Sequence, residues 1–279
     1  MPATRPAAGT AIINTADTVG NAAAGYWLVD AAGNPPDLKA AQPALTISGS
    51  LTYATTGPLG GHLTGAGGTS GVTSNPLANT IAAYPYYIGC SFVYSSGTPG
   101  DEAIAGLGDA TMGNGGIYAY ILVSGGTYGT SGHIVGVFRT VENGTVSVTD
   151  GPLVVTGTAY HCAFKVINGE GTSASAILVV NGSVYTPGAG GAGDFSANSL
   201  GNFSTHVLHR PGLDYYNASN KVDIAQAWYA RPTVTLTQTD LVNWTNDPWN
   251  SLTVAGGGSA SLSRIERGRT LGRGLGRGV

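Results

Sequence analysis

Acidic side chains that could carry acid–base catalysis are few in this chain. It has 279 residues and only four glutamates, which are Glu102, Glu142, Glu170 and Glu266. Asp101 and Glu102 are adjacent, so in a strand their carboxylates point to opposite faces. Catalysis by a carboxylate pair needs both groups at one substrate. The sequence shows no such pair, and we expect no catalytic residue and no enzyme.

Histidine and serine patterns give little support to metal or nucleophilic chemistry. In "HVLH", His206 and His209 are three apart in an expected strand, so their imidazoles face opposite sides of a sheet. Two surface or half-buried histidines are the favoured interpretation. A Ser-His-Asp site stays open, but no G-x-S-x-G turn occurs and no base can be assigned to a serine. We therefore expect no metal ligand set and no cofactor.

Aromatic residues are better candidates for binding. The chain has 14 tyrosines against 5 phenylalanines. In "GIYAYILV", Tyr118 and Tyr120 share the face opposite the aliphatic residues. If the aliphatic face is the core, both rings point outward and can stack on the apolar faces of sugars. Tyr215 and Tyr216 in "GLDYYNASN" form a second candidate pair. The alternative is ordinary tyrosine at a half-buried sheet surface.

Composition and charge exclude several classes of protein. Charged residues make up 10% of the chain, against about 25% in typical domains. The net charge of −3 combines five arginines and one glutamate after residue 263, a net of +4, with a body of −7. A body of this charge is not a general nucleic-acid binder. We see no signal peptide and no apolar run of the roughly 20 residues that span a bilayer.

The elements that must position these residues are strands. Runs of β-branched and aromatic residues are bounded by Gly, Asn, Asp or Pro, and they predict strands at 25–30, 84–95, 102–109, 116–124, 133–140, 144–150, 158–167, 175–182, 203–210 and 222–230. No helices separate them, so the sheets are antiparallel, as in a sandwich or a barrel. Cys90 and Cys162 lie in two of these runs, and buried thiols on neighbouring strands are the favoured interpretation. A disulfide between them stays open, although nothing indicates an oxidising compartment. Trp228 is expected in the core.

One helix is predicted, in "LTQTDLVNWTNDPW" (residues 236–249). Thr237 and Asp240 have the spacing of a capping box, and Leu236 and Leu241 have that of a hydrophobic staple. Leu241 and Trp244 form one apolar face. Pro248 ends the helix at or before Asp247.

Five segments, in order, resemble a known family. They are "AAGYWLVDAAGNPPDL", "LTYATTGPLGGHLTGAG", "YYIGCSFVYSSGTPGDEAIAGLGD", "TAYHCAFKVINGEGTSASAILVVNGSVY" and "VDIAQAWYARPTVTLTQTDLVNWTNDPW". Together they resemble the concanavalin A-like lectin/glucanase superfamily, in the laminin-G-like jelly-roll form found in bacteriophage virion proteins. The resemblance covers roughly residues 20–250 and implies an all-β, two-sheet antiparallel sandwich with one short C-terminal helix packed across the sandwich edge.

The resemblance also suggests a role. It implies a non-enzymatic virion structural protein, such as a capsid decoration, spike or tail-associated subunit, located in the virion. Its partners would be other virion proteins and further copies of itself, with host glycans as a further ligand and no role for membrane or nucleic acid. The alternatives are a free-standing lectin and, less favoured, a glycoside hydrolase, because the family's E-x-D-x-x-E pattern is absent. A single Ca²⁺ near Asp109 or Asp150 stays open.

The chain divides into an N-terminal arm (1–19), the sandwich (20–254) and a Gly/Ser linker with an arginine-rich arm (255–279). From Leu271 onward, glycine alternates with leucine, arginine and valine, so an extended arm has one bare face. We expect it to dock on a neighbouring subunit by strand addition, against the alternatives of a disordered end or nucleic-acid contact. The arm residues are Arg264, Arg267, Arg269, Leu271, Arg273, Leu275 and Arg277.

Overall fold

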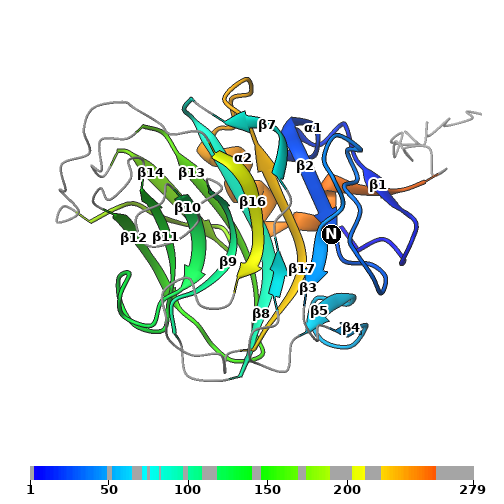
Figure 1. The fold of residues 1–279 in the computed structure, drawn as a ribbon, viewed down its shortest axis with the longest axis horizontal. Coiled ribbons are helices and arrows are strands. Elements are labelled where there is room, and N and C mark those ends of the chain that lie inside the picture. Colours follow the sequence, from blue (N-terminus) through cyan, green and yellow to red (C-terminus); the bar gives the residue numbers. More distant parts are fainter. Residues whose placement is uncertain are drawn as a thin grey trace, which may run out of the picture.

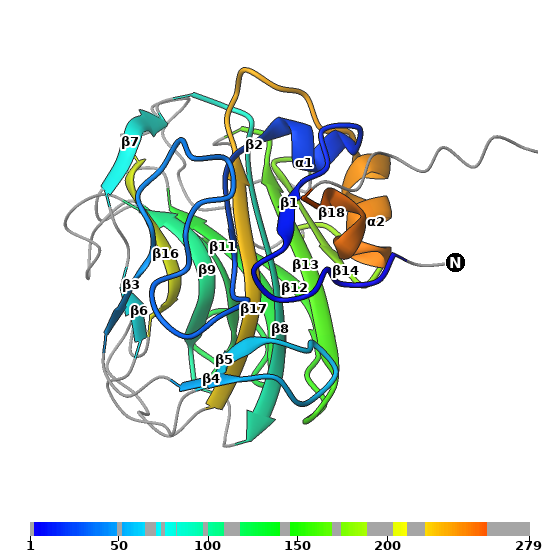
Figure 2. The ribbon, with the colours of Figure 1, turned by 90° about the vertical axis from the view of Figure 1, so that its right-hand side faces the viewer.

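The structure is a computed structural model of the whole chain. It describes residues 3–48, 52–64, 71–73, 76–81, 83–96, 100–108, 118–139, 146–168, 174–188, 203–210 and 221–255. These residues form two stacked antiparallel sheets with a helical segment on one side (Figures 1 and 2). No helix in this described part is long and apolar enough to cross a membrane.

The first sheet carries the helical segment. Its strand order is β15-β14-β13-β8-β17-β5-β4, and β2 also pairs with β17. The strands are β2 (Ala23–Leu28), β4 (Thr52–Ala54), β5 (His62–Thr64), β8 (Tyr86–Ser96), β13 (Ala159–Val166), β14 (Ala176–Val180), β15 (Ser183–Tyr185) and β17 (Lys221–Ala230). Long apolar runs such as that of β14 indicate a sheet that is buried on both faces.

The second sheet has the order β12-β11-β10-β9-β16-β6-β3, and β7 also pairs with β16. The strands are β3 (Thr46–Ser48), β6 (Gly71–Thr73), β7 (Pro76–Ile81), β9 (Glu102–Gly108), β10 (Tyr118–Val123), β11 (His133–Arg139), β12 (Ser147–Leu153) and β16 (Phe203–Arg210). Pro152 lies in β12, whose described residues pair only with β11. This agrees with the rule that proline is tolerated in edge strands.

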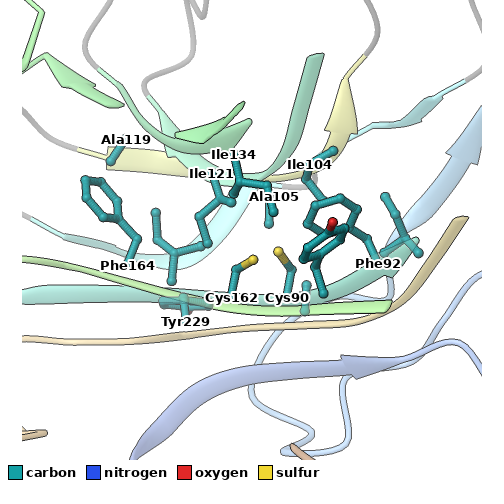
Figure 3. Close-up of a cluster of buried hydrophobic side chains, with 14 of the residues drawn as sticks. Cys90, Phe92, Ile104, Ala105, Ala119, Ile121, Ile134, Cys162, Phe164 and Tyr229 are labelled. Atoms are coloured by element: carbon teal, nitrogen blue, oxygen red, sulfur yellow. The ribbon is translucent and has the colours of Figure 1, made fainter. Parts of the chain in front are cut away.

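The main core lies between the two sheets. Phe92, Ile121 and Phe164 are fully buried there, together with the side chains drawn in Figure 3. Cys90 and Cys162 are directly opposite each other on β8 and β13, and both are buried free thiols. Burial raises the pKa of the Cys162 thiol well above its usual range. The prediction of buried thiols on neighbouring strands is confirmed.

The predicted fold class, an all-β antiparallel sandwich, is confirmed. Each of the ten predicted strands is present, with ends shifted by up to three residues. The sequence patterns did not predict the three-residue strands β3, β4, β5, β6 and β15, the six-residue β7, or two more three-residue strands at the termini, β1 (Ala11–Ile13) and β18 (Leu252–Val254). A strand of three residues is too short to show an alternating pattern, and some of these strands, such as β1 with β18, pair with distant parts of the chain.

Helix α2 (Gln238–Asn246) begins as predicted. The hydroxyl of Thr237 accepts from the backbone N–H of Asp240, whose carboxylate accepts from the backbone N–H of Thr237. Leu241 and Trp244 are buried. The helix ends before Asp247, and a 3-10 helix, η1 (Pro248–Ser251), follows.

The expected position of this helix, across the sandwich edge, is wrong. Helix α2 lies on the outer face of the first sheet (Figure 2). Its Trp244 packs against Trp228 of β17, with ring centroids 5.3 Å apart in an edge-to-face arrangement. Trp228 is buried as predicted, but in this outer cluster rather than between the sheets. The first sheet has apolar side chains on both faces, so its outer face also needs a cover.

The N-terminal segment also packs on this side. Strand β1 pairs with β18 beside helix α2 (Figure 2). The short helix α1 (Thr18–Ala22) contacts η1. Val19 is buried, and the backbone N–H of Ala255 donates to Thr10. Residues 3–19, part of the expected N-terminal arm, therefore contact the body. The arm residues from Arg264 to Arg277 lie outside the described residues.

Candidate functional site

The tyrosines proposed for glycan binding are not confirmed as an exposed surface. Tyr120 lies on the outer face of the second sheet, as expected from its position in β10, but its exposed fraction is 0%. The expectation that it is available for stacking is therefore wrong. The backbone of Tyr118 is in the same strand, and its side chain lies outside the described part, as do Tyr215 and Tyr216.

Tyr120 is buried because apolar side chains surround it on this outer face. It is opposite Gly106 of β9, where a β-carbon would collide with its ring. Leu122, Val135 and Val137 belong to the same buried cluster. Alternation along a strand predicts the side on which a residue lies, whereas its exposure depends on neighbouring strands.

The acidic candidates have structural roles in the described residues. Asp101 is buried and accepts from the backbone N–H of Gly125 at 2.9 Å. Asp150 accepts from the backbone N–H and the hydroxyl of Thr130, both at 3.0 Å. Each carboxylate therefore holds a loop. Asp109 and the side chain of Glu102 are outside the described part.

Metal ligands do not gather in the described part, where no group of three or more His, Cys, Asp or Glu side chains could hold an ion. His206 and His209 are in β16, the predicted strand, and their side chains lie outside the described residues. The calcium site near Asp109 or Asp150 remains a sequence-based expectation.

A serine–histidine pair that sequence reasoning missed lies on the outer face of the first sheet. Ser91 of β8 and His161 of β13 are paired across the strands, and Nδ1 of His161 is 2.8 Å from the Ser91 hydroxyl. Gln226 donates to the same hydroxyl at 2.8 Å and accepts from Tyr26 at 2.7 Å. Residues 70 positions apart in the chain gave no signal of this contact.

This pair is poorly placed for nucleophilic catalysis. The exposed fractions of Ser91 and Gln226 are both 0%, so a substrate cannot reach the hydroxyl. Burial lowers the pKa of His161 to about 4, which keeps the imidazole neutral near pH 7. A neutral imidazole and a buried hydroxyl satisfy each other as a structural hydrogen bond.

A small open pocket lies where α1, α2 and η1 meet, and we call it the junction pocket. Its volume is about 230 Å³. It is lined by Ala16, Asp17, Thr18, Val19, Asp240, Asn243 and Asn250. The lining residues come from two segments near the ends of the chain, residues 16–19 and 240–250, so only folding brings them together.

Asp17 lines one side of the junction pocket, and hydrogen bonds hold its carboxylate in place. As the N-cap of α1, it accepts from the backbone N–H of Gly20 at 2.7 Å. It also accepts from the side chains of Asn250, at 3.0 Å, and Ser251. These three donors hold both carboxylate oxygens and join α1 to η1.

Other groups in the pocket are free to bind a ligand. Asp240 uses one carboxylate oxygen, Oδ2, in its capping box. Within the described residues, its Oδ1, the side-chain amide of Asn243 and the Oδ1 of Asn250 have no hydrogen-bond partner in the protein. The capping box was visible in the sequence, but nothing indicated that Asp240 would face Asp17.

Comparison with solved structures agrees with the sandwich fold. Domain 4 of a GH43 extracellular arabinanase from Geobacillus stearothermophilus, solved with arabinotriose, is similar with a TM-score of 0.54 and 16% identity. The match covers 85% of this chain and 99% of that one. The botulinum neurotoxin serotype D binding domain matches with a TM-score of 0.57 and 12% identity, over 82% of this chain and 51% of that one.

The receptor-binding domain of botulinum neurotoxin mosaic serotype C/D matches with a TM-score of 0.55 and 9% identity, over 83% of this chain and 51% of that one. This chain thus spans about half the length of the neurotoxin chains. No protein-family model matches the chain, and no curated protein matches it. At these identities the likeness establishes a shared β-sandwich fold, while function must be argued from the site.

Proposed function

We propose that this protein is a non-enzymatic, lectin-like β-sandwich that binds carbohydrate through the junction pocket. The observation that carries the proposal is the set of unpaired polar groups there, supplied by Asp240, Asn243 and Asn250. A carboxylate and an amide oxygen accept hydrogen bonds, and the Asn243 amide can also donate. Sugar hydroxyls both donate and accept, so they match this set.

The polar lining also argues against an apolar ligand. Pockets for drug-like molecules are typically 300–1,000 Å³ and mostly apolar. The junction pocket is smaller, about 230 Å³, and most of its lining residues are polar. It therefore suits a small hydroxyl-rich group, such as one residue of an oligosaccharide. The arabinanase domain solved with arabinotriose supports the proposal by showing that a similar sandwich can occur with a bound saccharide.

The absence of enzymatic activity is part of the proposal. Glycoside hydrolysis uses two carboxyl groups that flank the scissile bond, one of which must donate a proton. Both oxygens of Asp17 accept hydrogen bonds from protein donors. Asp240 is held by Thr237. Both carboxylates therefore serve in structural hydrogen bonds within the described residues.

The test is a titration with arabinotriose by calorimetry, accompanied by a glycan array. Asn243→Leu removes the amide from the pocket and should weaken binding at least tenfold. Gln238→Leu is the matched control, because Gln238 is exposed on the same helix outside the pocket and should bind like the wild type. If no saccharide binds the wild type, or both variants bind equally, the assignment of the site is wrong. Release of reducing sugar would contradict the non-enzymatic part.

We further propose that the sandwich is a subunit of a bacteriophage virion. Support comes from the five ordered segments that resemble virion jelly-roll domains, and from the arginine-rich arm that we expect to act in assembly. Antibody-labelled particles viewed by electron microscopy should show the protein on the capsid or tail. Deleting residues 262–279 should abolish incorporation into particles. Unlabelled particles would favour the free-standing lectin.

A further inference from the structure

The N-terminal residues 3–9 form a strap over the outer face of the first sheet. The backbone N–H of Ala3 donates to the Asp247 carboxylate at 2.9 and 3.0 Å, and that of Gly9 donates to Asp30 at 2.9 Å. Between these ends, Pro6 is buried and Arg5 is partly buried. The strap is thus fastened at both ends, with one arginine inserted into the protein in the middle.

Arg5 occupies a socket made of backbone carbonyls. One nitrogen, Nη1, donates to the carbonyls of Leu59, at 2.7 Å, and Gly61, and the other, Nη2, donates to that of Val29. The guanidinium carbon lies 5.1 Å from the centroid of the Trp249 ring. We call these three carbonyls and the Trp249 ring the arginine socket.

The residues around the socket leave space for a planar guanidinium group. A β-carbon at Gly61 would lie 2.9 Å from Nη2 of Arg5 and 2.5 Å from the Tyr53 hydroxyl, so glycine at this position lets both side chains approach the backbone without shifting. Trp249 is the one tryptophan of the four that is not buried, and the cation covers its ring.

The chemistry of the socket selects arginine over lysine. Three carbonyls on two chain segments match the planar, fixed arrangement of N–H donors in a guanidinium group. The ammonium group of lysine is instead a compact point charge. Guanidinium groups also stack on aromatic rings. No carboxylate within 4.0 Å pairs with Arg5 in the described residues. The socket therefore recognises a guanidinium group by the geometry of its N–H donors and by its contact with the Trp249 ring.

We propose that the arginine socket is a binding site for an arginine of another chain, which Arg5 fills as an intramolecular plug. The partner chemistry is a cationic peptide with arginine between small residues, as in the arm of a second copy of this protein. A body with a net charge of −7 attracts such a peptide. Residues 3–9 pair with no strand in the described part, so displacing the strap would leave the strand pairs of the two sheets in place. This site is separate from the junction pocket, so the proposal stands apart from carbohydrate binding.

The experiment empties the socket with Arg5→Ala in the full chain and measures the melting temperature. N-acetyl-arginine amide should raise the melting temperature of the variant in a saturable way, because a ligand that binds only the folded state stabilises it. The lysine analogue should have little effect. Wild-type protein should respond at least tenfold more weakly, because Arg5 competes at high effective concentration.

A second titration uses the peptide of residues 264–279 and the same peptide with its five arginines replaced by lysine. The arginine peptide should stabilise Arg5→Ala at a lower concentration than the single amino-acid derivative. If Arg5→Ala does not fold, the titrations are made on Arg5→Lys, whose ammonium fills the socket only partly. The proposal is overturned if the arginine peptide has no effect, or if the lysine peptide or wild-type protein gives the same response.

Discussion

Glycine residues within the strands make room for aromatic rings. Gly89 of β8 is opposite Trp228 of β17, and Gly106 of β9 is opposite Tyr120 of β10. In each pair the ring lies where the glycine's β-carbon would be. Aromatic residues opposite glycine are a known way to stabilise strand pairs that glycine would weaken. The glycines of these strands thus contribute to packing as well as to turns.

We predict that Gly89→Ala destabilises the protein by about 1–3 kcal/mol, because the new methyl group overpacks the site against Trp228. Urea unfolding measures the change. Gly188→Ala is the control, since a β-carbon there meets no atom within 4 Å, and it should change stability by less than about 0.5 kcal/mol. Equal effects at both positions would show that packing against Trp228 is not the cause.

His161 makes stability depend on pH. Burial lowers its pKa from 6.5 to about 4, so the unfolded chain binds a proton more readily than the folded one. The neutral His161 side chain therefore makes its full contribution to the free energy of unfolding above pH 6.5. This contribution is lost as the pH falls towards 4, at up to about 1.4 kcal/mol per pH unit. Urea midpoints measured between pH 7 and 4 should fall more steeply for the wild type than for His161→Gln. Parallel curves would exclude His161 as the source.

At the scale of the element, helix α2 protects the first sheet. Its buried face, Leu241 and Trp244, covers apolar side chains of β13, β14 and β17 on the outer side of the sheet. The capping box at Thr237 fixes where this face begins. The same helix carries Asp240 and Asn243 on its other side into the junction pocket. One helix therefore links the packing of the sheet to the proposed binding site.

We predict that Trp244→Ala lowers the free energy of unfolding by about 3–5 kcal/mol, because it leaves a cavity beside Trp228. Denaturant unfolding gives the value, and Gln238→Ala, exposed on the same helix, should be nearly neutral. A loss below about 0.5 kcal/mol would mean that the helix does not help to hold the sheet.

At the scale of the whole molecule, the N-terminal and C-terminal segments of the described chain pack against each other. Strand β1 pairs with β18 through Ala11–Val254, Ile12–Thr253 and Ile13–Leu252. Asp17 is bonded to Asn250 and Ser251, and the strap is bonded to Asp247. The junction pocket lies at this meeting of the ends, and the arginine socket joins Arg5 and Trp249, one from each end, to the carbonyls of Val29, Leu59 and Gly61. Both sites therefore depend on the complete sandwich.

We predict that a chain ending at Ala255 folds like the full protein, with the same β-rich circular dichroism and a cooperative melt. Ala255 is the last residue with a hydrogen bond to the body in the described part. A chain ending at Leu252 loses the Ala11–Val254 and Ile12–Thr253 pairs and should melt at a lower temperature. An insoluble product from the chain that ends at Ala255 would show that the arm contributes to the core.

Several features were determined locally and could be predicted from the sequence. The strands follow from β-branched and aromatic runs between turn residues, and the all-β class follows from their number without intervening helices. The start of α2 follows from Thr237 and Asp240, which interact three residues apart. Buried thiols at Cys90 and Cys162 follow from their apolar runs. In each case the deciding contacts are short-range or depend on hydrophobicity alone.

The rest was decided by tertiary structure. Tyr120 lies on the predicted side of its strand, but Gly106 and the neighbouring strands bury it. Ser91 meets His161, and Arg5 meets Leu59, through pairings that span many residues. A local pattern specifies the direction of a side chain, whereas its exposure and partners depend on which distant segments pack beside it. The junction pocket joins residues 16–19 to 240–250, and the arginine socket joins Arg5 to Val29, Leu59, Gly61 and Trp249, so only the folded chain could bring these residues together.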